Sequence, residues 1–251
     1  MPDFPLLELK SVSKSFGAGP VLDKVSLQIR AGERRGLIGP NGAGKTTLIN
    51  VVTGKYRPDA GYILYDGHEI TKLASYERSR LGIGRSFQIM NLFNEASVGE
   101  NIRSAVLRKR GLGINVFRRL AGLDDVFAEV EHIAAMVGLL SALKEPVATL
   151  AYGLQRRLDL ALVLAQDPQL LILDEPAAGL SATETRDLIG LLKTITSRRT
   201  LILVEHDMDV VYALADRITV LDYGRVLMEG TPADVNADPE VRRVYLGEEI
   251  A

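Results

Sequence analysis

The stretch GPNGAGKT at residues 39–46 constrains this chain more than any other part of its sequence. It matches the pattern G-x-x-x-x-G-K-[ST], and the apolar run RRGLI precedes it directly. Gly39, Gly42 and Gly44 allow the backbone to curl, so that successive N–H groups point inward at the start of a helix and form a nest for an anion. The stretch therefore predicts a strand, a phosphate-binding loop and a helix in succession. The alternative, a glycine-rich turn with an incidental lysine, does not account for the complete match in this context.

The residues of this loop suit the phosphates of a nucleotide. Lys45 is expected to reach the β- and γ-phosphates, and the Thr46 hydroxyl is expected to bind Mg²⁺. The sequence thus predicts a nucleoside triphosphate and Mg²⁺ as ligands. The predicted nucleotide-binding residues of the loop are Gly39, Pro40, Asn41, Gly42, Ala43, Gly44, Lys45, Thr46 and Thr47.

Short runs of continuous apolar residues recur later in the chain, as in parallel strands that are covered on both faces. These runs are LLILD (170–174), TLILVEH (200–206) and ITVLDYG (218–224). Helical patterns occur at residues 45–53, 158–166, 183–197 and 209–214. Strands that alternate with helices predict an α/β core with a mainly parallel sheet. Nearer the N-terminus, Val25, Leu27 and Ile29 alternate with polar residues, which predicts antiparallel strands within residues 6–30.

Residues 92–157 contain no strand-like run, and helical patterns occur there at 98–110 and 126–140. Basic residues gather in the first part of this segment and acidic residues in the second, which is typical of a solvated face. We therefore predict an inserted α-helical subdomain. The predicted division is an α/β core at 1–91 and 158–229, the insertion at 92–157 and a C-terminal tail at 230–251, all within one domain of residues 1–251.

Two acidic residues end the strand-like run LLILDEP. The carboxyl end of such a strand is expected beside the phosphate loop, so Asp174 is expected to hold Mg²⁺ and Glu175 to orient or deprotonate the attacking water. A solvated Asp-Glu turn is the alternative interpretation. His206 follows the run TLILVE in the same way and is expected to contact the γ-phosphate, although a single histidine is more often structural. His68 and His132 lack such a position and are expected on the surface.

The segment AYGLQRRLDLALVLA at 151–165 is expected to form a turn, Ala-Tyr-Gly, followed by a helix. Pro168 ends the helical pattern. Its apolar face consists of Leu158, Ala161, Leu162 and Ala165. No Ser, Asp or Asn occurs at 150–154 to cap the first turn. The N–H groups at a helix start carry partial positive charge and have no partner within the helix, so this start is open to an anion.

The composition excludes several classes of protein. A net charge of −2 and a pI near 6.0 give no electrostatic signal for nucleic-acid binding. The chain has no cysteine, so disulfides and cysteine-based metal sites or nucleophiles are excluded. No signal peptide is predicted, because the first residues, MPDFPLLELK, contain no basic region followed by an apolar run. No membrane-spanning segment is predicted either, because no apolar run approaches the roughly 18 residues that a span needs. We therefore expect a cytoplasmic protein that meets a membrane only through partners.

These pieces together resemble the nucleotide-binding subunits of ABC transporters over nearly the whole chain. The matching motifs, in the order of that family, are GPNGAGKTT (39–47), SFQ (86–88), LAYGLQRR (150–157), LLILDEP (170–176) and VEH (204–206). The resemblance implies ATP as the nucleotide and Phe16 as the aromatic residue that stacks on adenine. It also implies that Gln88 contacts the metal, that Glu175 is the catalytic glutamate and that His206 senses the γ-phosphate.

In that family a Leu-Ser-Gly-Gly-Gln signature faces the γ-phosphate bound by a second subunit, and LAYGLQ stands in its place here. The resemblance thus implies a dimer that closes on ATP. The residues to which it assigns this contact are Ala151, Tyr152, Gly153, Leu154 and Gln155. Ala151 lacks the usual serine hydroxyl, and Tyr152 and Leu154 replace a glycine and a glutamine. Ser181 stands where the family commonly has aspartate, which puts in question any contact across the dimer that needs that aspartate.

A second set of short matches indicates one branch of the family. The segments NLF, DEPAAGL, VEHDM and GTPADV…VYLGEE, together with AYG, resemble the ATPases of branched-chain amino acid importers. This resemblance implies a second ATPase subunit, identical or paralogous, two integral membrane permeases, an external solute-binding protein and a place on the inner face of the membrane. Urea importers and the lipopolysaccharide-export ATPase are the related alternatives. A soluble ABC ATPase that acts on ribosomes or DNA, and a P-loop kinase, fit the motifs and the charge less well.

Overall fold

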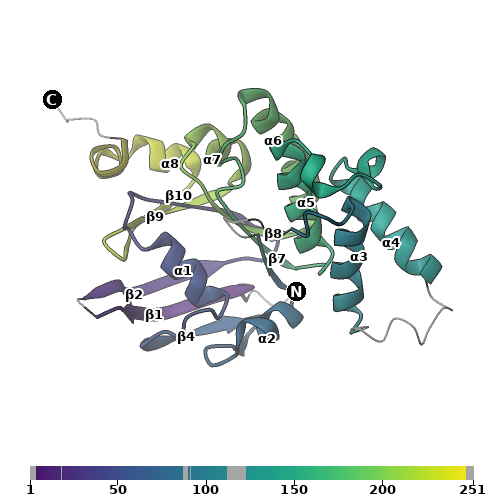
Figure 1. The fold of residues 1–251 in the computed structure, drawn as a ribbon. Coiled ribbons are helices and arrows are strands. Elements are labelled where there is room, and N and C mark those ends of the chain that lie inside the picture. The colour runs from purple at the N-terminus through teal and green to yellow at the C-terminus, as the bar shows by residue number, and fades with distance from the viewer. Residues whose placement is uncertain (1–3, 18, 87–89, 91, 112–122, 247–251) are drawn as a thin grey trace.

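Two β-sheets and a body of helices make up the structure, a computed structural model that describes residues 4–17, 19–86, 90, 92–111 and 123–246. Helix α1 (Lys45–Val52) lies between the two sheets, and its apolar residues pack against both of them (Figure 1). The body of helices lies to the right in Figure 1 and contains α3 (Val98–Lys109), α4 (Leu123–Met136) and α5 (Tyr152–Leu164). This arrangement agrees with the predicted α/β core that carries an inserted helical part.

The larger sheet has six strands and is mainly parallel, as the apolar runs predict. Its order is β10 (Arg225–Gly230), β9 (Arg217–Asp222), β3 (Arg34–Ile38), β8 (Thr200–Val204), β7 (Leu170–Asp174) and β6 (Ile83–Arg85). Only the pairing of β10 with β9 is antiparallel among the neighbours in this sheet. Strand β6 is absent from the sequence prediction because three residues are too few to show a pattern.

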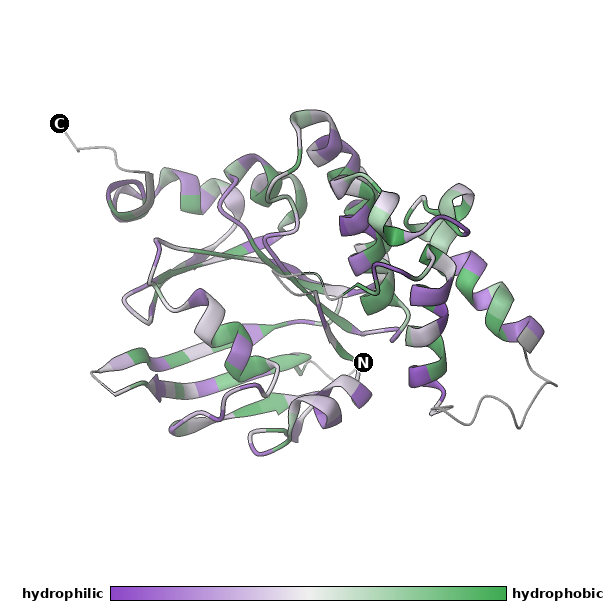
Figure 2. Ribbon diagram, viewed as in Figure 1, coloured by the Kyte–Doolittle hydropathy of each residue, from purple (hydrophilic) through white to green (hydrophobic). Residues whose placement is uncertain are grey.

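The strands of this sheet are covered on both faces. On β7, Leu170 and Ile172 pack toward α1, whereas Leu171 and Leu173 pack toward α5 and α6 (Ala182–Ile195). Every residue of β7 and β8 is buried, and Figure 2 colours the strands in the middle of the molecule mostly green. Burial on two faces explains why these strands read as continuous apolar runs instead of alternating ones.

The smaller sheet is antiparallel and lies on the other side of α1. Its order is β2 (Pro20–Ile29), β1 (Leu7–Ser15), β4 (Ala60–Tyr65) and β5 (His68–Glu69). Val25, Leu27 and Ile29 are buried while Ser26 and Gln28 are exposed, which confirms the predicted alternation. Strands β4 and β5, and the following helix α2 (Ser75–Arg80), are not part of the sequence prediction, because they are short and few of their residues are buried.

The helical part has charged pairs between its helices. Arg110 follows α3, and its Nη2 lies 2.5 Å from Oε2 of Glu129 on α4. Lys109 Nζ lies 3.8 Å from Oε1 of the same carboxylate. The basic and acidic runs in this segment are therefore not only a solvated face, because part of them joins α3 to α4.

Helix α5 begins at Tyr152, so the expected Ala-Tyr-Gly turn is wrong: Tyr152 and Gly153 belong to the first helical turn. Ala151 is the extended N-cap residue, with φ −60° and ψ 150°, and the N–H of Leu154 donates to its carbonyl oxygen. The helix also continues across the predicted boundary between residues 157 and 158. A tyrosine and a glycine are weak helix formers, and contacts of this turn with the rest of the chain override that weak preference.

The end of the larger sheet at β9 and β10 is covered by short helices. These are α7 (Met208–Leu214), α8 (Pro232–Ala237) and α9 (Pro239–Val241). They share a small apolar cluster with β3 and β9. Shorter helical turns occur at Leu140–Ala142, Val147–Thr149, Thr196–Arg198 and Arg242–Leu246.

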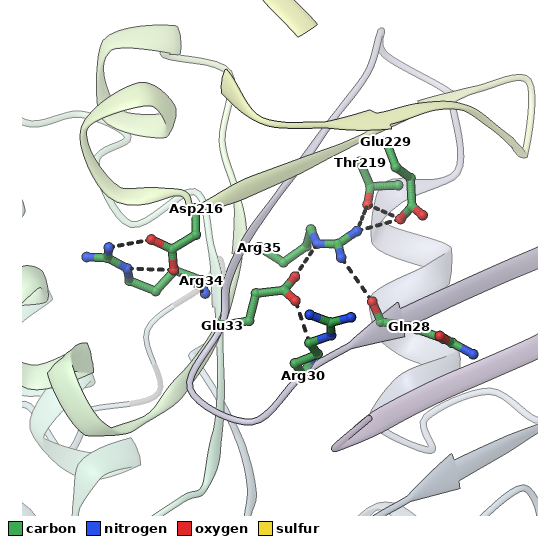
Figure 3. Close-up of polar contacts among 8 residues, drawn as sticks. All are labelled: Gln28, Arg30, Glu33, Arg34, Arg35, Asp216, Thr219 and Glu229. Carbon is green, nitrogen blue, oxygen red and sulfur yellow. Dashed lines mark hydrogen bonds and ion pairs between the residues drawn. The ribbon is translucent and has the colours of Figure 1, made fainter. Parts of the chain in front are cut away.

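A buried arginine joins the two sheets at the amino end of β3 (Figure 3). Arg35 is 3% exposed, and its Nε donates to Glu33 Oε1 at 2.6 Å. Its Nη1 donates to Thr219 and Glu229, on β9 and β10, and its Nη2 donates to the carbonyl oxygen of Gln28 on β2. The two carboxylates compensate the buried cation, and the cluster connects β3, β9 and β10 to β2 of the smaller sheet.

Candidate active site

The loop between β3 and α1 has the backbone that its sequence predicts. Gly39, Gly42 and Gly44 have φ values of 150°, 83° and 102°, which residues with a Cβ rarely adopt. A Cβ at Gly39 would lie 2.1 Å from the carbonyl oxygen of Leu221, and at Gly44 it would also meet the backbone. The N-cap residue of α1, Gly44, has no side chain to cap the helix, so the first N–H groups of α1 are open to an anion.

Lys45 folds back over its own loop. Its side chain is 7% exposed, and Nζ donates to the carbonyl oxygens of Gly39 at 2.6 Å and Pro40 at 3.0 Å. Burial lowers the pKa of Lys45, while the charges of Glu175 and Asp174 act in the opposite direction. The cation is thus held within the loop that it is predicted to serve, and both predicted carboxylates are close enough to influence its charge.

The residues expected to bind Mg²⁺ have the right donor atoms for it. Asp174 ends β7 and is 3% exposed, and Thr46, in the first turn of α1, is exposed. Mg²⁺ prefers oxygen ligands and takes few of them from protein, the rest coming from phosphates and water. Within the described ranges there is no group of three or more His, Cys, Asp or Glu residues that could hold a metal ion. One carboxylate and one hydroxyl, which leave the rest of the coordination shell to phosphate oxygens and water, fit an ion that arrives with the nucleotide.

Asp174 also has a partner that the sequence does not indicate. Arg85, at the end of β6, donates through Nη2 to Asp174 Oδ2 at 2.8 Å. The same guanidinium donates through Nη1 to Asn50 Oδ1 on α1 at 2.6 Å. Arg85 thus links the predicted metal ligand to the helix that follows the phosphate loop.

Glu175 and His206 follow the adjacent strands β7 and β8, and their side chains meet. His206 Nε2 lies 3.1 Å from Glu175 Oε1, and the two side chains are 42% and 24% exposed. Glu175 has a φ of 51°, in the left-handed region that is uncommon for a residue with a Cβ. Such a backbone persists only where the surroundings hold it, and it is frequent at functional sites. His68 and His132 are exposed, as expected.

Phe16 lies just after β1 and is 45% exposed. Its ring makes an edge contact with Tyr56, with the ring centroids 5.1 Å apart, and Lys14 Nζ lies 5.4 Å from the Phe16 centroid. The two rings form a partly exposed aromatic corner, and the stacking of Phe16 on adenine stays a prediction. The predicted metal contact Gln88 lies outside the described residues.

The predicted signature residues surround the start of α5. Ala151 makes no side-chain cap, so the helix start is open as expected. The hydroxyl of Tyr152 donates to the carbonyl oxygen of Ala178 at 3.3 Å, in the loop that follows Glu175. Gln155 Nε2 donates to the carbonyl oxygen of Leu150 at 3.0 Å, which holds the chain where it enters the helix. 

Glu184 on α6 is the common neighbour of Gly153 and Ser181. A Cβ at Gly153 would lie 2.5 Å from Glu184 Oε1. The hydroxyl of Ser181 donates to Glu184 Oε2 at 2.7 Å and accepts from the Glu184 N–H, which makes a capping box at the start of α6. Ser181 therefore has a capping role within its own subunit. Leu154 is half-buried and packs against the apolar core of the helical part.

Sequence reasoning missed a buried carboxylate beside this site. Glu205 directly precedes His206, is 3% exposed and accepts from the N–H of Ala177 at 2.8 Å. The only signal for Glu205, and for Arg85, is a charged residue at the end of an apolar run next to a motif. That signal does not identify the partner, because the partner comes from another strand.

Comparison with known proteins places this chain in a family. Residues 22–178 match the family model described as ABC transporter. The chain belongs to the ABC transporter family. Residues 225–251 match a second family model, described as branched-chain amino acid ATP-binding cassette transporter.

Two relatives match this ABC ATPase over nearly its whole length. BraF of Pseudomonas aeruginosa, a high-affinity branched-chain amino acid transport ATP-binding protein, is 38% identical over an alignment of 256 residues that covers 97% of this chain and 98% of BraF. LivG of Escherichia coli K12, which carries the same description, is 38% identical over 255 residues, with the same shares of each chain.

Solved ATP-binding cassettes have the same fold. A nucleotide-free cassette from an ABC transporter has a TM-score of 0.85 at 25% identity and covers 98% of this chain and 100% of its own. The ADP conformation of the cassette MJ1267 has a TM-score of 0.82 at 26% identity, with the same coverage. The predicted α/β P-loop fold and the ATPase activity are thereby confirmed. Among the helices that the structure describes, none combines the length and apolar character needed to cross a membrane.

Proposed function

We propose that this ABC ATPase supplies the energy for the import of branched-chain amino acids. The observation that carries the proposal is the pair Glu175 and His206, whose side chains meet at the ends of two strands in a chain with a phosphate loop. The solute class is supported by the names of BraF and LivG, which are 38% identical to this chain. 

Binding of ATP begins at the phosphate loop. The N–H groups at the start of α1 bind the β- and γ-phosphates. Lys45 Nζ exchanges the carbonyl oxygens of Gly39 and Pro40 for phosphate oxygens, and Phe16 stacks on adenine. The lysine is already placed at the loop, so binding requires a change of partners more than a movement of the backbone.

Thr46, Asp174 and Gln88 would hold Mg²⁺ in this proposal, and the bound ion would supply charge withdrawal from the phosphate oxygens. Glu175 accepts a proton from the water whose oxygen attacks the γ-phosphorus. The bond from the γ-phosphorus to the bridging oxygen breaks, and ADP and phosphate result. His206 holds the Glu175 carboxylate through Nε2 and contacts the γ-phosphate.

The signature at the start of α5 serves the nucleotide of a second subunit, identical or paralogous. Its helix start is uncapped, so its N–H groups can bind the γ-phosphate held by the partner. Ala151 has no hydroxyl, so the contact depends on backbone groups near Gly153. The dimer works on the inner face of the membrane with two permeases, and a solute-binding protein delivers the amino acid.

Reconstitution tests this function. Vesicles that contain the chain and the membrane proteins that co-purify with it are expected to transport leucine to the side of the membrane that carries the ATPase. The assay needs ATP and Mg²⁺ on that side and the solute-binding protein with leucine on the other. Chelation of Mg²⁺ and the variant Lys45→Ala are each expected to abolish this uptake. Uptake of urea instead of leucine would assign the chain to the related urea importers. Failure to co-purify any membrane protein would contradict a transport role.

A further inference from the structure

A buried carboxylate lies directly behind the pair Glu175 and His206. Glu205 follows β8 and precedes His206, and its side chain is 3% exposed. Its Oε1 accepts from the N–H of Ala177 at 2.8 Å, and its Oε2 accepts from the N–H of His206 at 3.1 Å. One side chain thus binds backbone groups from the two loops that carry the pair.

The loop after β7 needs such support because of the backbone at Glu175. A φ of 51° is unfavourable for glutamate, and it persists only where neighbouring bonds over-determine it. Two backbone bonds contribute: the N–H of Glu175 donates to the Val204 carbonyl oxygen, and the N–H of Ala178 donates to the Glu175 carbonyl oxygen. The bond from Ala177 to Glu205 is different, since it depends on the identity of a side chain.

We propose that Glu205 is a positioning residue for ATP hydrolysis, which clamps the backbone after Glu175 to the backbone at His206 and so keeps the two side chains 3.1 Å apart. The inference rests on the roles given above to Glu175 and His206. In the described part of the chain, the Glu205 carboxylate accepts from the N–H groups of Ala177 and His206 and makes no hydrogen bond to the phosphate loop, so we expect ATP binding not to depend on it.

A carboxylate suits this place because it has two acceptor oxygens and no hydrogen atom. An amide has one oxygen and an NH₂ group, so Glu205→Gln can satisfy Ala177 or His206 but must place its NH₂ group against the other N–H. The variant keeps the volume of the side chain and loses the clamp. Glu205→Ala loses both the volume of the side chain and the clamp.

The test compares Glu205→Gln with a control, Glu229→Gln. Glu229 lies on β10 and belongs to the Arg35 cluster at the amino end of β3, whereas the phosphate loop follows the carboxyl end of that strand. Both changes remove a carboxylate from a hydrogen-bonded cluster, but only the first lies beside Glu175. For Glu205→Gln we expect kcat to fall by roughly 10- to 100-fold, the effect of a misplaced catalytic group, with KM for ATP and nucleotide affinity close to wild type. The control is expected to keep kcat while it loses stability.

Hydrogen exchange gives a readout that does not depend on activity. The amide of Ala177 is expected to exchange faster in Glu205→Gln and Glu205→Ala than in the wild type, and unchanged in the control. A wild-type kcat in Glu205→Gln, an unchanged Ala177 amide, or an equal loss of kcat in Glu229→Gln would each overturn the inference. Normal turnover in Glu175→Gln would instead show that Glu175 is not the catalytic base. This result distinguishes failure of the proposed function from failure of the inference about Glu205.

Discussion

Arg78, on α2, holds the far end of the helix that begins at the phosphate loop, and Arg78→Met is expected to destabilise the chain. Arg78 has a relative exposure of 0%. Its Nη1 donates to the carbonyl oxygens of Val51 at 2.8 Å and Val52 at 2.7 Å, at the end of α1. Its Nε and Nη2 donate to the carbonyl oxygens of Leu73 and Thr71. A cation at the carboxyl end of a helix also interacts favourably with the helix dipole.

The magnitude follows from two opposing effects. Methionine has a similar length but no donor, and each buried carbonyl group that loses its donor costs about 1–3 kcal/mol. Burial lowers the pKa of Arg78 to about 10, so the folded chain already carries the cost of burying a cation. The variant no longer has that cost, which is about 1.4 kcal/mol per pKa unit. Four carbonyl groups that lose a donor cost about 4–12 kcal/mol, and the relieved burial of the cation offsets roughly 3–4 kcal/mol of this, so we expect a net loss of about 1–8 kcal/mol in the free energy of unfolding.

Urea unfolding without nucleotide measures this loss, because bound nucleotide would add its own stabilisation. Arg80→Met is the matched control, since Arg80 lies on the same helix and is exposed, and it is expected to change stability by less than about 0.5 kcal/mol. Arg78→Lys keeps the charge without the planar fork and is expected to fall between the two. A loss below about 1 kcal/mol for Arg78→Met would refute the reasoning, because it would mean that water replaces the guanidinium without cost.

Three further variants test the site. Lys45→Ala is expected to reduce nucleotide affinity and ATPase activity steeply in a folded protein, and wild-type activity would contradict the loop assignment. Glu175→Gln is expected to bind ATP, to favour dimers in size exclusion, and to lose roughly 10²–10⁴-fold in turnover; normal turnover would exclude Glu175 as the base. Gly153→Asp places a carboxylate beside Glu184 and at the contact with the partner's phosphate, so ATP-dependent dimerisation is expected to vanish while monomers still bind ATP. Weak ATP binding by a folded Gly153→Asp monomer would place the signature in its own subunit's site.

Parts of the fold were predictable because burial shows directly in the order of residues. Strands β7 and β8 are buried on both faces, and this leaves a continuous apolar run in each. Strand β5 has two exposed residues and β6 has three residues in all, so neither leaves a pattern. The start of α5 was mispredicted for another reason: Tyr152 and Gly153 favour a turn locally, and the contacts of Tyr152 with Ala178 and of Gly153 near Glu184 arise only in the folded chain.

The amino-acid sequence alone determined the phosphate loop, because the φ values at Gly39, Gly42 and Gly44 follow from short-range steric limits that glycine relaxes. The tertiary structure alone decided the contact between Glu175 and His206 and the bond from Ala177 to Glu205. These residues follow different strands, and they meet because β7 and β8 are neighbours in the sheet. That neighbourhood results from packing of the whole core, since strands that follow one another in sequence are neighbours only about two-thirds of the time, and the apolar runs themselves do not specify the order.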